Sequence, residues 1–452
     1  MSAEPRPGLP RLDRSLRSAP KAPVRIVHLG LGAFHRSHQA WYTQHAGDAA
    51  DWGIAAFTGR SPRAADTLAE QDGLFTLVER SAAGDSYEVI GSIVEAVDGA
   101  DVGRLAELVA APDTAIVTLT ITEAAYAVDA SAGSAGSAGS SSTPIARLVA
   151  ALAARRDAGS GPIAVVSCDN LADNGSVASQ AIRALAEARE PALAAWIDAN
   201  VSFVSTSVDR ITPRTTAADL ASVAESCAYR DEAAVVAEPF HNWILSGDFP
   251  AGRPQWEDAG AIFVDNLEPY ENRKLWLLNG AHSILAYAGQ VRGHATVAEA
   301  LSDAVCRDAV ESFWDEAARH LTDDALAIPE YRQALLERFG NARIAHLLSQ
   351  IAADGTAKLR MRALPVLAAE RAAGRSGDGA ARMIAAWMTY VATTAEFQDP
   401  LAGDIREALT LDGEARCAAL LALLSPELAQ DRDLVGQLRG LQNAMTATIA
   451  RS

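Results

Sequence analysis

Short apolar runs alternate with helical patterns over residues 24–122, and no other feature limits the possible folds as strongly. Runs rich in β-branched residues, typical of strands, are VRIVHLG, GIAAFTG, FTLVER, YEVIGSIVEAV and TAIVTLTIT. Between or after them stand the helical patterns AADTLAEQ and DVGRLAELVAA. Strands that alternate with helices are typical of a parallel sheet built from strand–helix–strand units. The sequence therefore predicts an α/β fold for this part of the chain.

The pattern changes near residue 265. Later segments, such as AARMIAAWMTYVATT, have long helical periods and almost no strand signal. A chain of 452 residues is also too long for one ordinary core. We therefore expect a parallel-sheet domain over residues 1–265 and a mainly α-helical domain over residues 266–452. The Gly-, Ser- and Ala-rich stretch at 129–143 is predicted to be a flexible surface loop.

The charge and cysteine content exclude several classes of function. With 39 Lys and Arg against 57 Asp and Glu, the formal net charge is −18, which disfavours binding to nucleic acid or to anionic lipid. The four cysteines are scattered without a C-x-x-C pair, which suits a reducing cytosol better than a disulfide framework or a zinc site. We find neither a signal-peptide pattern nor an apolar run long enough to span a bilayer. The sequence predicts a cytoplasmic protein.

The stretch VRIVHLGLGAFHRSHQA, residues 24–40, resembles a nucleotide-binding turn. Gly30 and Gly32 supply the first two glycines of G-x-G-x-x-G, but His35 occupies the third place. Because the turn follows a strand and opens a helical segment, it predicts a Rossmann-type domain, with Arg36 adding charge beside a pyrophosphate. His35 and His38 could instead bind a metal, but no carboxylate or cysteine accompanies them, so we predict no metal site.

The second strand lacks an expected acid. Dinucleotide sites normally carry a carboxylate about twenty residues after the glycines, where it binds the adenosine ribose. Here the segment FTGRSPR offers Thr58, Arg60 and Arg63 instead. These arginines could hold a 2′-phosphate or could simply be solvated, so the choice between NAD and NADP stays open.

Two further segments carry polar residues in apolar surroundings. The turn SCDNLADNG, residues 167–175, follows a strand, at the edge where open α/β sheets bind ligands. Taken alone, however, it is better explained as an ordinary turn. In EPYENRKLWLLNGAHS, residues 268–283, Lys274 stands among Trp and Leu, so a lowered pKa and a role as general base are expected. A snorkelling lysine beside a core histidine, His282, is the alternative.

Helix geometry raises a difficulty for the second segment. In a regular α-helix Asn279 would lie about 140° around the axis from Lys274, and His282 about 12 Å along it. The three side chains could then meet one substrate only if that substrate is extended, or if Gly280 loosens the helix.

Taken together, five motifs resemble one family. GLGAFHRSHQ, TLTITEAAY, SCDNLADNG, FVSTSVDRITP and YENRKLWLLNGAHS are similar, in this order, to the polyol-specific long-chain dehydrogenases, the mannitol 2-dehydrogenase and fructuronate/tagaturonate reductase family. The resemblance covers nearly the whole chain from residue 24. The chain departs from the family in its short Gly/Ser segment and its missing acid. The resemblance implies a metal-free dehydrogenase that binds substrate between its two domains.

The resemblance also implies residue roles. Lys274 matches the catalytic general acid/base, and Asn170 and Asn279 match two amides that donate to the substrate oxygen. Further matches are His282, which positions substrate, and Glu271, which passes protons to solvent. Cofactor contacts are predicted, from the motifs and from the resemblance, at Gly30, Gly32, Phe34, His35, Arg36, Thr58, Arg60, Glu123 and Asp209, and substrate contacts at Lys358 and Arg210.

The sequence thus predicts hydride transfer between NAD, with NADP not excluded, and C2 of a linear polyol or ketose of the mannitol/fructose type. The first alternative is a fructuronate or tagaturonate reductase, which needs a cation for the substrate carboxylate. The second is a nucleotide-binding sensor without turnover, which Lys274 and the two amides argue against. Expected partners are a sugar alcohol, ketose or sugar acid, and the protein is expected to be a monomer or weak homo-oligomer.

Overall fold

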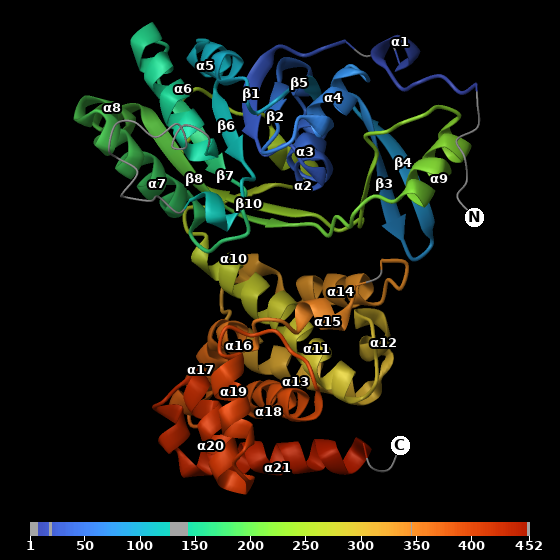
Figure 1. The fold of residues 1–452 in the computed structure, drawn as a ribbon, viewed down its shortest axis with the longest axis vertical. Helices are drawn as coiled ribbons and strands as arrows, with labels where there is room; N and C mark the ends of the chain where they lie inside the picture. The colour runs from blue at the N-terminus through green and yellow to red at the C-terminus, as the bar shows by residue number, and fades with distance from the viewer. Residues whose placement is uncertain (1–7, 18–19, 127–142, 345, 450–452) are drawn as a thin grey trace. The chain divides into compact units, whose positions relative to one another are not determined.

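The computed structural model describes residues 8–17, 20–126, 143–344 and 346–449. Of the segment at 129–143, all but Thr143 lies outside the described residues. The chain divides into two compact units, Met1–Leu267 and Glu268–Ser452, and each is described by itself (Figure 1).

The first unit is built on an eight-stranded sheet with the order β11-β10-β8-β7-β6-β1-β2-β5. Neighbouring strands from β5 to β8 run parallel, whereas β10 runs antiparallel to β8. This sheet confirms the predicted α/β fold class. Its strands are β1 (Val24–Leu29), β2 (Gly53–Phe57), β5 (Ile93–Val97), β6 (Ile116–Leu119), β7 (Ile163–Ser167), β8 (Val201–Asp209), β10 (Asn242–Ser246) and β11 (Ile262–Phe263).

Alternate residues of each central strand bury opposite faces of the sheet. Ile26 on β1 packs in a core with Tyr42, whereas its neighbour Val27 packs in a separate core with Leu148. Both faces are therefore apolar, as a parallel sheet requires. The helices are α2 (Ala33–Ser37), α3 (Gln39–His45) and α4 (Arg63–Ala69), then α5 (Val102–Ala110), α6 (Pro144–Ala158), α7 (Asn174–Arg189) and α8 (Pro191–Asn200).

A second sheet of three strands, ordered β4-β3-β9, differs from the sequence expectation. Its strands are β3 (Phe75–Ser81), β4 (Gly84–Ile90) and β9 (Val235–Ala237), and α9 (Ala217–Cys227) belongs to the same unit. The run YEVIGSIVEAV is thus divided between two sheets, because β4 forms an antiparallel hairpin with β3 whereas β5 joins the large sheet.

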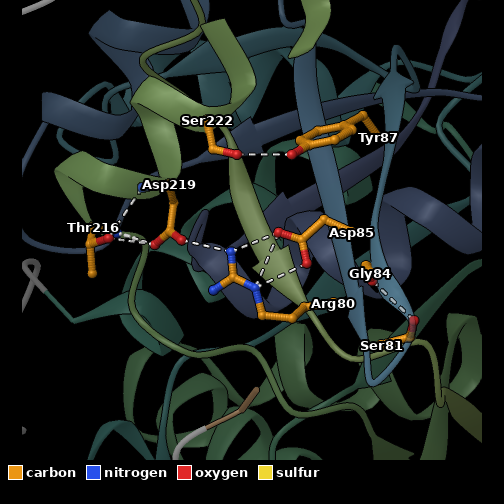
Figure 2. Close-up of polar contacts among 8 residues, drawn as sticks. All are labelled: Arg80, Ser81, Gly84, Asp85, Tyr87, Thr216, Asp219 and Ser222. Atoms are coloured by element: carbon orange, nitrogen blue, oxygen red, sulfur yellow. Dashed lines mark hydrogen bonds and ion pairs between the residues drawn. The ribbon is translucent and has the colours of Figure 1, made fainter. Parts of the chain in front are cut away.

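A polar cluster ties α9 to this small sheet (Figure 2). The guanidinium of Arg80 on β3 binds Asp85 on β4 at 3.1 Å and Asp219 on α9 at 2.8 Å. Asp219 also closes a capping box with Thr216 at the start of α9. One charge network therefore fixes the hairpin and the helix together.

The second unit is helical, as predicted. It begins with α10 (Glu268–Arg273) and the π-helix η6 (Lys274–Gly280), which continue into the buried helix α11 (Ala281–Val291). None of the described helices combines the length and the apolar character that crossing a membrane requires. The remaining helices are α12 (Val297–Ser302), α13 (Ala304–Ala318), α14 (Ile328–Phe339), α15 (Leu348–Ile351), α16 (Gly355–Arg362), α17 (Leu364–Ala372), α18 (Asp378–Thr393), α19 (Ala402–Leu409), α20 (Gly413–Leu424) and α21 (Arg432–Ile449).

Candidate active site

The glycine turn after β1 is fixed between two neighbouring strands. Gly30 has a φ of +112°, and a Cβ there would overlap the backbone oxygen of Thr120. The backbone N–H groups of Gly30 and Leu31 both donate to the carbonyl of Phe57, at 3.0 and 2.9 Å. Only glycine fits this position, because the chain must turn in a left-handed conformation directly against β6.

A stacked pair of histidines explains why His35 replaces the third glycine. The ring of His35 on α2 is fully buried and lies 3.4 Å from the ring of His28 on β1, with 7° between the ring planes. His28 in turn contacts the hydroxyls of Thr118 at 2.8 Å and Thr120 at 3.1 Å. Burial lowers the pKa of His28 to about 3 and that of His35 well below its usual value, so both rings are neutral. The helix thus packs on the strand through two rings instead of through a glycine.

The other motif residues flank the turn. Arg36 donates to Gly32 O at 3.1 Å and to the carbonyl of Ala233, which joins the turn to the segment before β9. Phe34 is half-buried and its ring lies 5.0 Å from that of His38. Direct contacts of Phe34 and His35 with a cofactor stay predictions, while the observed packing supports a role for His35 beneath the turn.

A pocket of about 1180 Å³ opens at the carboxyl ends of β1, β2, β5 and β6. Open α/β sheets bind their ligands at this edge. Gly30, Thr58 and Arg60, all predicted cofactor residues, line the pocket together with Asp98 and Arg147. Its position above the turn and its mixed polar and apolar lining fit the adenosine and phosphate portion of a dinucleotide.

Asp169 has a role that the sequence interpretation missed. Its carboxylate is buried and accepts the backbone N–H groups of Ile121 at 3.1 Å and Thr122 at 2.8 Å, and the Tyr126 hydroxyl at 2.6 Å. Thr122 has a φ of +73°, a conformation that a β-branched residue adopts only when its surroundings enforce it. The acid that follows β7 therefore holds the loop after β6, so SCDNLADNG is more than an ordinary turn.

Three residues that were predicted to contact cofactor or substrate lie at or just after the ends of β6, β7 and β8. Glu123 is exposed at the start of the short 3-10 helix η2 (Glu123–Ala125), directly after the strained Thr122. Asn170 is exposed directly after Asp169, and Asp209 is half-buried at the end of β8. All three are consistent with contacts to ligand, which stay predictions.

Arg210, in contrast, makes internal contacts through its whole guanidinium. It donates to Glu238 O at 3.0 Å and to Ser37 O at 2.6 Å, and it forms an ion pair with Glu79. The side chain has no exposed area. These contacts support a role in holding the end of β8 in place, and a direct contact with substrate stays a prediction.

In the second unit, the π-helix removes the geometric difficulty noted for Lys274 and Asn279. Its hydrogen bonds join residues five apart, so five residues complete slightly more than one turn. Lys274 and Asn279, which are five apart, therefore lie close to one face of the helix. Gly280 does not loosen the helix locally; the whole stretch from Lys274 is wound more widely.

Side chains from two other helices support the π-helix. Trp314 on α13 donates its indole N–H to Leu277 O at 2.7 Å. Arg362 on α16 donates to Asn279 O at 3.1 Å and to the Ser283 hydroxyl at 2.9 Å. Gly280 allows close packing, since a Cβ there would lie 2.5 Å from Cε1 of Phe313. The wide turn is therefore held by tertiary contacts.

His282 lies among positive charges. It is buried, and its ring lies 4.9 Å from that of His346 and 4.7 Å from that of Phe339. Burial, followed by the charges of His346, Arg338, Arg362 and Lys358, lowers the pKa of His282 well below its usual value. Burial and the charge of Arg362 also lower the pKa of Lys358, which donates to Ile351 O at 2.9 Å. His282 is therefore neutral and sits beside the predicted substrate residue Lys358.

Lys274 and Glu271 are both half-buried, one helical turn apart. The lowered pKa expected of Lys274 stays a prediction. In the described part of the chain, no group of three or more His, Cys, Asp and Glu side chains is arranged to hold a metal ion.

Comparison with known proteins identifies both units. Residues 24–258 match the mannitol dehydrogenase Rossmann domain, and residues 266–445 match the mannitol dehydrogenase C-terminal domain. D-mannonate oxidoreductase of Escherichia coli (strain K12) is 36% identical, with 91% of each chain covered.

Solved structures agree with this assignment. The structure of mannitol 2-dehydrogenase from Pseudomonas fluorescens, a ternary complex with NAD and D-mannitol, has a TM-score of 0.76 and 31% identity, covering 98% of this chain and 99% of the other. A D-sorbitol dehydrogenase in substrate-free form has a TM-score of 0.88 and 27% identity, covering 96% and 98%. The predicted family is confirmed, and the chain is an oxidoreductase that belongs to the mannitol dehydrogenase family.

Proposed function

We propose that the protein is a metal-independent secondary-alcohol dehydrogenase that transfers hydride between a nicotinamide dinucleotide and C2 of a linear polyol or its ketose. The π-helix carries this proposal, because it brings Lys274 and Asn279 toward one face. The relative from Pseudomonas fluorescens, which was solved with NAD and D-mannitol, supports both the cofactor and the substrate class. The cytoplasmic location and the monomeric or weakly oligomeric state predicted from the sequence are part of the same proposal.

Lys274 is the proton acceptor when the alcohol is oxidised and the proton donor when the ketone is reduced. Its neighbours Leu277 and Leu278 are buried apolar side chains, and an apolar environment favours a neutral amine, which can accept the proton. Glu271, one helical turn earlier, would pass the proton on to solvent. When bound, the nicotinamide ring accepts or returns the hydride.

The amide groups act on the substrate oxygen. Negative charge builds on this oxygen as its proton leaves, and N–H donors aimed at it stabilise that charge. Asn279 supplies one donor from the π-helix, and Asn170, which follows β7, supplies the second. Each such donor typically lowers the barrier by ~3 kcal/mol. His282, neutral and buried, would orient a neighbouring hydroxyl.

The cofactor would be held in the first unit. Gly30 and Gly32 allow its phosphates to approach the turn, and Thr58 and Arg60 line the pocket for its adenosine end. The strained loop at Thr122, which Asp169 fixes, borders the same pocket. These assignments follow from the pocket and the motif together.

A sugar acid is the second candidate substrate. The positive charges of Arg338, Lys358 and Arg362 all act on His282, and a substrate carboxylate would be stabilised by such a group. The Escherichia coli relative is named for oxidation of D-mannonate, a sugar acid, which supports this alternative.

A substrate panel separates these candidates. The purified protein is assayed with mannitol, fructose, fructuronate, tagaturonate and mannonate, and oxidation or reduction of the nicotinamide is followed by its absorbance. Turnover of mannitol and fructose is the expected result, whereas turnover of the acids alone would replace the polyol with the second candidate. Cofactor binding without turnover of any sugar derivative would favour the nucleotide sensor.

A further inference from the structure

Two pockets meet at the end of β2. The larger one, described above, shares Leu31, Thr58, Gly59 and Arg60 with a smaller pocket of about 490 Å³. The larger pocket continues toward the end of β5, whereas the smaller one continues along the loop after β2 and into α4 as far as Thr67. A ligand bound in the larger pocket would therefore have a branch point at Thr58–Arg60 from which a substituent enters the smaller pocket.

In dinucleotide-binding sheets the adenosine ribose lies at the end of the second strand, where an acid normally binds the 2′-hydroxyl. The segment after β2 in this chain, residues 58–63, contains no carboxylate. A carboxylate at this place would repel a 2′-phosphate, and an arginine nearby accommodates one. This segment has no carboxylate but has two arginines, Arg60 and Arg63.

The smaller pocket is positively charged. Arg36, Arg60 and Arg63 line it, opposed by Glu232. Arg60 and Arg63 are exposed, and neither guanidinium forms a hydrogen bond or ion pair within the described residues, unlike Arg80 or Arg104 of the same unit. In a chain of net charge −18, such a local concentration of free guanidinium groups is what a phosphate requires.

Two other groups complete the pocket. Burial lowers the pKa of Arg36 to about 10, so this side chain is still charged at neutral pH even though it is engaged with the turn. The Ser61 hydroxyl accepts the backbone N–H of Arg63 at 3.4 Å, which leaves its own proton for an anion. The pocket thus offers fixed charge from Arg36 and hydrogen-bond donors from the loop.

Asp98 lines the larger pocket and not the smaller one. It follows β5, and one of its oxygens accepts the N–H of Ala100 at 3.1 Å and the hydroxyl of Thr58 at 3.4 Å. It lines the larger pocket together with Arg147 and is absent from the lining of the smaller one. Of the two acids Asp98 and Glu232, Glu232 lines the smaller pocket, whereas Asp98 lines only the larger one.

We propose that the smaller pocket binds the 2′-phosphate of NADP(H) through Arg60 and Arg63, so that the protein prefers NADP(H) to NAD(H). This inference rests on the proposed function only in requiring that the first unit binds a nicotinamide dinucleotide. It assigns the cofactor preference that the sequence left open.

Calorimetric binding of adenosine 2′,5′-bisphosphate and of 5′-AMP to the full-length protein tests the pocket without any turnover. The bisphosphate is expected to bind at least about tenfold more tightly than AMP, because only it places a phosphate between the two guanidinium groups. The double variant Arg60→Gln/Arg63→Gln should lose this difference, because it removes the two guanidinium groups that distinguish the bisphosphate from AMP. Arg189→Gln, a change at an exposed arginine on α7, is the matched control and should alter neither affinity.

The outcomes separate this inference from the proposed function. Equal affinities for the two nucleotides, or a preference that survives the double variant, would overturn the phosphate pocket while leaving the dehydrogenase proposal intact. Failure to bind either nucleotide or any nicotinamide dinucleotide would overturn both. The ratio of kcat/KM for NADP to that for NAD gives an independent readout and is expected to exceed one and to fall in the double variant.

Discussion

Replacing Trp314 with phenylalanine tests whether the π-helix sets the catalytic geometry. The indole N–H of Trp314 donates to Leu277 O at 2.7 Å, and both residues are fully buried. Phenylalanine keeps an aromatic ring but cannot donate, so a buried carbonyl loses a partner, at a cost of about 1–3 kcal/mol in the free energy of unfolding.

The variant is also expected to affect turnover. Without this external donor the segment can relax toward an α-helix, in which Asn279 lies about 140° from Lys274. Loss of one amide donor from the substrate oxygen slows the reaction by ~100-fold. The cofactor pocket lies wholly in the first unit, so cofactor affinity should be unchanged.

Three measurements check this prediction: the free energy of unfolding from urea titration, kcat at saturating substrate, and the cofactor Kd. Trp387→Phe is the matched control, because Trp387 is also fully buried in the second unit but lies on α18. It should lose stability and keep kcat within about twofold. Equal turnover in the two variants, whether retained or lost, would refute the role given to the π-helix.

Two further predictions concern the first unit. Asp169→Asn should weaken cofactor binding and lower the free energy of unfolding by about 1–3 kcal/mol, because the N–H groups of Ile121 and Thr122 lose a charged acceptor. Calorimetry measures the first effect and urea titration the second. An unchanged cofactor Kd would contradict the role given to the loop. The neutral His28–His35 pair should also make stability depend on pH. Burial lowers the pKa of His28 to about 3, so below its unfolded value of about 6.5 the unfolded chain binds more protons than the folded one. The free energy of unfolding should therefore fall as the pH drops from about 6.5 toward 3, and His28→Gln should show a shallower slope in urea titrations at successive pH values.

Much of the fold was predictable because buried parallel strands and amphipathic helices have distinct local patterns. β1, β2 and β6 are apolar on both faces, and the helical unit shows its period directly. The separate assignment of β4 and β5 was not predictable, because β3, the partner of β4, is itself paired with β9, more than 150 residues further along the chain. No local pattern encodes such a long-range pairing.

In the candidate active site, too, the sequence revealed the identities of the residues but not their geometry. The identities of Lys274 and Asn279 stand out in the sequence, but their relative angle depends on a π-helix held by Trp314 and Arg362, which follow much later. The reason for His35 became clear only from the stacking of its ring on that of His28 in β1. Residues that act through tertiary contacts leave little local signal.

The central claim, that Lys274 exchanges the proton of the substrate hydroxyl, is tested most directly by Lys274→Met. Steady-state kcat and the cofactor Kd are measured for this variant and for Lys21→Met, a control at an exposed lysine of the first unit. The account predicts that kcat falls by ~10²- to 10⁴-fold in Lys274→Met while cofactor affinity stays within about twofold of the unmodified protein. Retained turnover, or parallel losses of turnover and cofactor affinity, would contradict it and would make Lys274 a structural residue.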